Sequence, residues 1–226
     1  MSKLETIFAT PLAFADLEQP ESLNAELRRF FLECEKQGER FENPDRNTHR
    51  NHALFESLFS LFDWKHAAVQ QLREFCLGQL YQLIGQLNGY DLDALRRLHM
   101  ADESWFHITR RNGYFGPHNH PLHSWSGVYC VCQEGDDPES DSGRLTFLNP
   151  NSPMFVDMAL FRMSGAFQLT HLSLRLKPGQ LVLFPSWLQH YVSPFEPKGD
   201  GLRITVAFNT RFQMQGFEPP RRPTLP

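Results

Sequence analysis

The pattern of apolar residues changes near residue 103, and this change constrains the fold more than any other feature of the sequence. Beyond it, short runs rich in β-branched and aromatic residues alternate with clusters of Gly, Pro, Asn and Asp. That alternation is typical of an antiparallel barrel or sandwich. The runs that we predict to be strands span residues 105–109, 125–132, 144–147, 166–176, 180–184 and 202–208.

The first hundred residues instead predict helices. Apolar residues recur at helical spacing in 20–36 and again in 54–87, with a break expected near Asp63. Asn88-Gly89 ends the second region, and residues 91–100 fit either a short helix or a loop. Helices followed by strands indicate an α+β fold in which the helices buttress one face of the sheet.

A length of 226 residues fits one domain. We predict a single domain over residues 1–212, with a mainly helical part in 1–100 and the β core in 103–212. Residues 154–163 fit a loop or a short helix, and the proline-rich segment 213–226 is predicted to be an extended or disordered tail.

Composition excludes several partners. The formal charge is −4, which gives no global field favouring nucleic acid or an anionic membrane. No apolar run approaches the ~20 residues of a membrane span, and the N-terminus lacks the pattern of a signal peptide. We therefore expect a cytoplasmic protein whose four cysteines are free thiols, with Cys130 and Cys132 packed in the core rather than paired on a metal.

Three histidines, His118, His120 and His123, fall close together after a turn-rich segment. Side chains alternate along an extended chain, so His118 and His120 point to the same side and can reach one metal ion. His123 has an odd offset and is expected to point to the other side. An exposed histidine-rich turn is the alternative interpretation.

A second segment strengthens the metal hypothesis. Residues 177–190 read as a turn, a buried strand that Pro185 ends, a second turn and then His190. Arg203 begins the next apolar strand, where an isolated buried charge would be very costly. Its partner is therefore either a protein carboxylate or a ligand carboxylate, which a guanidinium can hold by two hydrogen bonds.

Taken in order, these segments resemble the Fe(II)- and 2-oxoglutarate-dependent oxygenases, in particular an uncharacterised bacterial branch related to the prolyl hydroxylases. The resemblance implies a double-stranded β-helix, also called a jelly-roll or cupin-like barrel, with buttressing N-terminal helices. It also implies Fe(II), 2-oxoglutarate and O2, and hydroxylation of an unidentified small-molecule or peptide substrate. The matching pieces are FATP (8–11), HNHP (118–121), SGVY (126–129), SGRLTF (142–147), PGQLVLFPSW (178–187), His190 and RITVAFN (203–209).

The resemblance also implies roles for single residues. His118 and His190 match the two histidine ligands of the iron. Arg203 and Thr205 match the pair that binds the distal carboxylate of 2-oxoglutarate. Two further residues are candidates for an additional hydrogen bond to this co-substrate, Tyr129 and His107.

His120 departs from the pattern, because the superfamily usually has Asp or Glu at this position. We predict that His120 is the third ligand; a site with three imidazoles could also favour another divalent metal, or leave His120 facing the substrate. Two other functions therefore stay open: a cupin-like three-histidine metalloenzyme without 2-oxoglutarate, and a non-catalytic barrel. The helical part leaves a homodimer open as well.

Overall fold

The computed structural model describes residues 8–45, 48–135, 137–151 and 170–216. Its strands form two antiparallel sheets, with the orders β1-β8-β5-β10-β3-β2 and β4-β9-β6-β7. In chain order the elements are β1 (Ala13–Asp16), α1 (Glu21–Lys36), η1 (Gly38–Arg40), β2 (Leu54–Glu56), η2 (Leu61–Asp63), α2 (Ala67–Asn88), α3 (Leu92–Arg96), β3 (Leu98–Thr109), β4 (Phe115–His118), β5 (Trp125–Gln133), β6 (Leu145–Leu148), β7 (His171–Leu174), β8 (Gln180–Pro185), β9 (His190–Val192) and β10 (Arg203–Met214).

The two sheets enclose an apolar interior between them. One buried cluster joins Val182 and Phe184 of the large sheet to Phe115, Phe147 and Val192 of the small sheet. Each contributing strand turns alternate side chains toward this interior, so its other residues face outward. The arrangement is a double-stranded β-helix and confirms the fold class predicted from the sequence.

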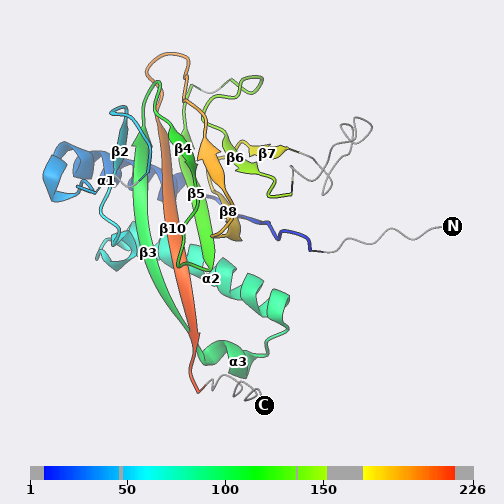
Figure 1. Cartoon of the computed structure of the whole chain (residues 1–226). Helices are drawn as coiled ribbons and strands as arrows, with labels where there is room; N and C mark the ends of the chain where they lie inside the picture. The colour runs from blue at the N-terminus through cyan, green and yellow to red at the C-terminus, as the bar shows by residue number, and fades with distance from the viewer. Residues whose placement is uncertain (1–7, 46–47, 136, 152–169, 217–226) are drawn as a thin grey trace, which may run out of the picture.

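Helices α1 and α2 cover the outer face of the large sheet and lie behind the long strands in Figure 1. A second buried cluster joins Phe31 of α1 and Leu72 of α2 to Phe106, Tyr129 and other outward-facing strand residues. The rings of Phe31 and Phe106 stack with centroids 4.1 Å apart. The helices therefore buttress the sheet, as predicted.

The predicted helix over residues 54–87 is partly wrong. Leu54–Glu56 forms β2, which pairs with β3, and α2 begins only at Ala67. All three residues of β2 are buried, so pairing with a neighbouring strand outweighs local helical spacing. Two other strands that the sequence missed, β1 and β4, have only four residues each.

Two boundaries also differ from expectation. β3 starts at Leu98 and β10 continues to Met214, so the long β3–β10 ribbon extends past the predicted end of the domain at residue 212. Of the predicted strand 166–176, β7 covers His171–Leu174. The segment 154–163 and the last ten residues of the predicted tail lie outside the described residues.

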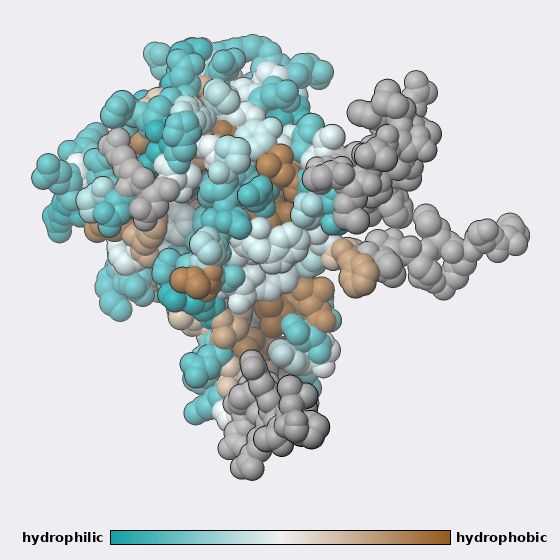
Figure 2. All heavy atoms as spheres, in the orientation of Figure 1, coloured by the Kyte–Doolittle hydropathy of each residue, from teal (hydrophilic) through white to brown (hydrophobic). Residues whose placement is uncertain are grey.

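Most of the surface facing the viewer in Figure 2 is polar, and apolar side chains gather in smaller patches below its middle. Within the described part of the chain, no helix has the length and apolarity that crossing a membrane requires.

Candidate metal centre

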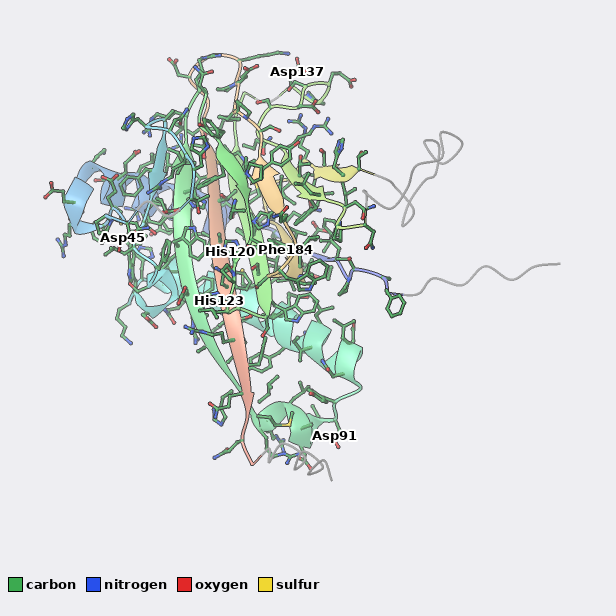
Figure 3. All side chains as sticks on the ribbon, viewed as in Figure 1. Asp45, Asp91, His120, His123, Asp137 and Phe184 are labelled. Carbon is green, nitrogen blue, oxygen red and sulfur yellow. The ribbon has the colours of Figure 1, made fainter. Side chains whose placement is uncertain are left out.

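Antiparallel pairing of β4 with β9 brings His118 opposite His190, with ring centroids 4.4 Å apart. His120 follows in the loop after β4, where its backbone N–H donates to the carbonyl of Ser186 over 2.9 Å. The ligand nitrogens of the three histidines all lie within 4.8 Å of one another. The sequence-predicted triad is therefore brought together at one point, and Figure 3 shows His120 near the middle of the molecule.

Backbone carbonyls orient two of these rings. Nδ1 of His118 lies 2.8 Å from the carbonyl oxygen of Gly116, and Nδ1 of His190 lies 2.9 Å from that of Leu188. A carbonyl only accepts, so in each ring Nδ1 carries the proton and Nε2 keeps its lone pair. A hydrogen bond from the other ring nitrogen is the usual support of a metal-binding histidine.

The electrostatics of the cluster also suit metal binding. Burial lowers the pKa of His118, and burial together with the neighbouring imidazoles lowers the pKa of His120 to about 2 and that of His190 to about 3. All three rings are thus neutral at physiological pH, which is the form that donates a lone pair to a metal. Imidazole suits iron, zinc, copper and nickel, so the donor set fits Fe(II).

The triad opens on a cavity of about 380 Å³ between the two sheets. Arg203, Thr205 and His107 line the same cavity, with Arg203 only 3% exposed. Thr205 on β10 pairs with His107 on β3, and alternation places Arg203 on the same face as Thr205. Four residues predicted to bind the metal or the co-substrate therefore line the same cavity: Arg203, Thr205, His107 and His190.

Gly143 packs directly on the Arg203 side chain. A Cβ at Gly143 would lie 3.1 Å from Cδ of Arg203 and 3.1 Å from Cδ2 of Phe195, and its φ of +62° is in the left-handed region. Glycine meets both demands at little cost. This explains physically why a glycine stands in the SGRLTF segment.

A buried hydrogen-bond and ion-pair network centred on Glu56 lies beside His107. Glu56 on β2 accepts a hydrogen bond from Nδ2 of Asn43 over 2.8 Å, and its Oε1 lies 3.3 Å from the guanidinium of Arg50. Nε2 of His107 lies 3.1 Å from Oε2 of Glu56 and 2.8 Å from the indole nitrogen of Trp105. Glu56 was placed in a predicted helix, so no sequence signal pointed to this contact.

The network also shifts the pKa values of its members. Burial raises the pKa of Glu56, but His107, Asn43 and Arg50 outweigh it, so the carboxyl has a pKa below its ordinary value. Burial lowers the pKa of His107, and the charges of Arg50 and Arg203 add to this against the opposing effect of Glu56. The cavity therefore holds an ionised carboxylate and a neutral imidazole near Arg203.

Tyr129 does not reach the cavity, which corrects its predicted role. It is fully buried on the helix side of β5, where its hydroxyl donates to Oδ1 of Asn24 on α1 over 2.8 Å. The neighbouring Val128 lines the cavity instead. The β-alternation of this strand was visible in the sequence, but which face looks inward was not.

Two other expectations concern residues outside the triad. His123 is not part of the cluster; it lies at the cavity rim with Nε2 3.4 Å from Oε2 of Glu103. Cys130 is fully buried and Cys132 partly buried, and both are free thiols. The described residues place neither thiol in a metal cluster.

Three neutral imidazoles within a double-stranded β-helix form a candidate metal centre in a protein of the jelly-roll class. Residues 103–209 match the model of a family described as "Putative 2OG-Fe(II) oxygenase", and this segment contains every residue of the triad as well as Arg203. The match and the fold together indicate a 2-oxoglutarate-dependent Fe(II) oxygenase. None of the curated proteins matches the sequence.

Solved structures share the fold at low identity. A Pseudomonas putida prolyl-4-hydroxylase superimposes with a TM-score of 0.57 at 19% identity, covering 92% of this chain and 94% of that one. A Trichoplax adhaerens prolyl hydroxylase in complex with a hypoxia-inducible-factor peptide gives 0.59 at 13%, covering 88% and 82%. HygX from Streptomyces hygroscopicus, with nickel and 2-oxoglutarate bound, gives 0.52 at 10%, covering 89% and 83%.

Proposed function

We propose that this protein is a dioxygenase that hydroxylates an organic substrate, with Fe(II) held by His118, His120 and His190 and with 2-oxoglutarate anchored by Arg203. In the balanced reaction R–H, 2-oxoglutarate and O2 give R–OH, succinate and CO2. The observation that carries the proposal is the shared cavity, which is lined by the three neutral imidazoles and by a buried arginine.

Each side chain has a defined task in this proposal. The Nε2 atoms of His118 and His190 are fixed as lone-pair donors by the carbonyls of Gly116 and Leu188. The planar guanidinium of Arg203 binds the distal carboxylate of 2-oxoglutarate by two hydrogen bonds, and the hydroxyl of Thr205 lies on the same strand face. When bound, the iron and the co-substrate supply the oxidising chemistry with O2.

The charge balance of the site makes the metal depend on the co-substrate, because the usual carboxylate ligand is missing. Three neutral imidazoles leave the two positive charges of Fe(II) uncompensated inside a buried cavity. The chelating carboxylate of 2-oxoglutarate offsets one of these charges at the metal, whereas Arg203 compensates the distal carboxylate. Co-substrate and metal are therefore expected to bind together, each strengthening the other by the same factor.

Anaerobic titration of the protein with Fe(II) and 2-oxoglutarate tests the proposal. We expect one iron per chain and a visible absorption band of the iron–2-oxoglutarate chelate, and slow substrate-independent succinate formation once O2 is admitted. Iron binding with neither the band nor succinate would contradict 2-oxoglutarate dependence.

That outcome would favour a second candidate, a three-histidine metalloenzyme that does not use 2-oxoglutarate. The specific observation in its favour is His120, which stands in the triad where a carboxylate is usual. Absence of stoichiometric metal after anaerobic purification would instead indicate a non-catalytic barrel.

A further inference from the structure

A chain of buried hydrogen bonds beside the triad has no task in binding iron or 2-oxoglutarate. The hydroxyls of Ser186 and Ser126 lie 2.8 Å apart, and the Ser126 hydroxyl donates to Oδ1 of Asn209 over 2.7 Å. All three side chains are buried, with Asn209 only 4% exposed. The backbone carbonyl of Ser186 also accepts a hydrogen bond from the N–H of His120, so these hydrogen bonds are connected to the histidine triad.

These hydrogen bonds fix the orientation of the Asn209 side-chain amide. Because Oδ1 accepts from Ser126, Nδ2 points away from the serines, and Asn209 lines the cavity. Within the described residues Nδ2 has no hydrogen-bond partner. It is also not one of the fully buried polar atoms that lack a partner, so part of its surface is open. Two N–H donors of this amide are therefore available to whatever fills the cavity.

Asn209 lies far from the proposed co-substrate anchor. It is on the same strand as Arg203 and on the same face, six residues further along, which corresponds to roughly 20 Å at ~3.3 Å per residue. A five-carbon dicarboxylate gripped by Arg203 does not extend that far. Asn209 therefore faces the part of the cavity that 2-oxoglutarate leaves open.

An aromatic side chain and a balanced ion pair lie near Asn209. Trp105 is the register partner of Ala207, so it lies diagonally across from Asn209 on the same face of the sheet. Its ring packs on Phe59, with centroids 4.5 Å apart. Glu103, the register partner of Asn209, is held by Arg211 at 3.2 Å. Among the described residues that line the cavity, Arg203 is the only lysine or arginine, so no second cation is left to hold an anionic substrate.

We propose that Asn209 orients the substrate, its side-chain N–H donating to an acceptor oxygen of an uncharged molecule whose apolar part lies on Trp105. The inference rests on the proposed function, since it assumes that Arg203 takes the co-substrate. The substrate class that fits is a neutral amide or another uncharged oxygen acceptor with a planar or apolar group. A carboxylate or a phosphate is not expected, because the described lining residues offer it no second basic side chain.

Benzamide is a suitable probe, because it combines a neutral acceptor oxygen with an aromatic ring. The protein is loaded with Zn(II) and 2-oxoglutarate, which prevents turnover, and nitrogen-15 NMR follows the Asn209 side-chain amide and the Trp105 indole N–H. The amide resonance is assigned by its absence from Asn209→Asp and Asn209→Ala. Benzamide should shift both signals, whereas benzoate and benzylamine, which have the same ring with opposite charges, should bind at least about tenfold more weakly.

Both Asn209 variants should weaken benzamide binding by about tenfold, the effect of losing one buried hydrogen bond. The matched control is Gln213→Glu, the same amide-to-carboxylate change on the same strand face, at an exposed position; it should leave binding unchanged. Melting curves of each variant establish that it is folded. Asn209→Ala makes the test independent of any disturbance caused by the new carboxylate in Asn209→Asp.

Several outcomes would overturn the inference. They are benzamide binding that both variants retain, equal or tighter binding of benzoate or benzylamine, and no benzamide binding to a protein that does bind Zn(II) and 2-oxoglutarate. Retention in Asn209→Asp with loss in Asn209→Ala would show that the amide accepts rather than donates. Failure of wild-type protein to bind 2-oxoglutarate would instead count against the proposed function itself.

Discussion

His118 on β4 is the register partner of His190 on β9, and their rings lie 4.4 Å apart. The metal centre thus depends on the pairing of two very short strands in the small sheet. His120 joins them from the following loop, held by the backbone of Ser186.

Loss of a residue that only orients a metal ligand typically weakens metal binding by roughly 10- to 100-fold. Replacing His120 by Ala should weaken Fe(II) or Co(II) binding by more than this, because it removes a ligand. His120→Asp should retain metal, because a carboxylate at this position completes the usual facial set. His123→Ala serves as the control, since His123 lies outside the triad. Calorimetric titration measures all three, and equal affinity of His120→Ala and wild type would show that His120 is not a ligand.

Arg203→Gln should raise the Kd for 2-oxoglutarate by about 10- to 100-fold, since a charge-assisted hydrogen bond is worth about 1.5–3 kcal/mol. Arg203→Lys should recover only part of this, because a lysine cannot form the two-pronged contact. Metal affinity without co-substrate should not fall. Arg211→Gln removes an arginine from the exposed end of the same strand and should leave the Kd unchanged.

Gly143→Ala should both destabilise the protein and weaken 2-oxoglutarate binding, because the new Cβ would meet Cδ of Arg203 at 3.1 Å. Gly199→Ala is the matched control: its φ of +72° is similarly left-handed, but nothing lies within 4 Å of its Cβ. Each should lose about 1–2 kcal/mol from the backbone conformation. Only Gly143→Ala should lose more and bind the co-substrate less tightly, as denaturant unfolding and equilibrium titration would measure.

Tyr129→Phe should lower the free energy of unfolding by about 1–2 kcal/mol, because it leaves the buried Oδ1 of Asn24 without its donor. The affinity for 2-oxoglutarate should not change, since Tyr129 faces the helices. A weaker co-substrate affinity in this variant would contradict the placement of Tyr129 in the structure.

Cys34 should react slowly with iodoacetamide in the folded protein. Burial raises the pKa of its thiol to about 11, so at pH 8 almost none of it is the reactive thiolate. The rate should rise as the pH approaches 11, and denaturation at pH 8 should make Cys34 react at once. Peptide mass spectrometry of samples taken over time measures both. Rapid labelling of Cys34 in the native protein at pH 8 would be inconsistent with its burial on α1.

The sequence predicted those parts of the fold in which local pattern and tertiary environment agree. Residues 125–132 became β5 and residues 180–184 became β8, because long apolar runs between turns have few other ways to bury their side chains. Residues 54–56 were misassigned because a three-residue strand has no periodicity of its own. Only its partner β3 makes it a strand.

By itself, the sequence determined which residues could bind the metal and the co-substrate: the period-two spacing of His118 and His120, and an arginine opening an apolar strand, carry that information locally. Tertiary structure alone decided which face of each strand points into the barrel, because alternation of side chains defines two faces but does not determine which of them is the inner one. It therefore turned Tyr129 toward α1, set His190 against His118, and brought Glu56 to His107. It also fixed the orientation of the Asn209 amide. This orientation depends on the hydroxyls of Ser126 on β5 and Ser186 after β8, which are far apart in the sequence.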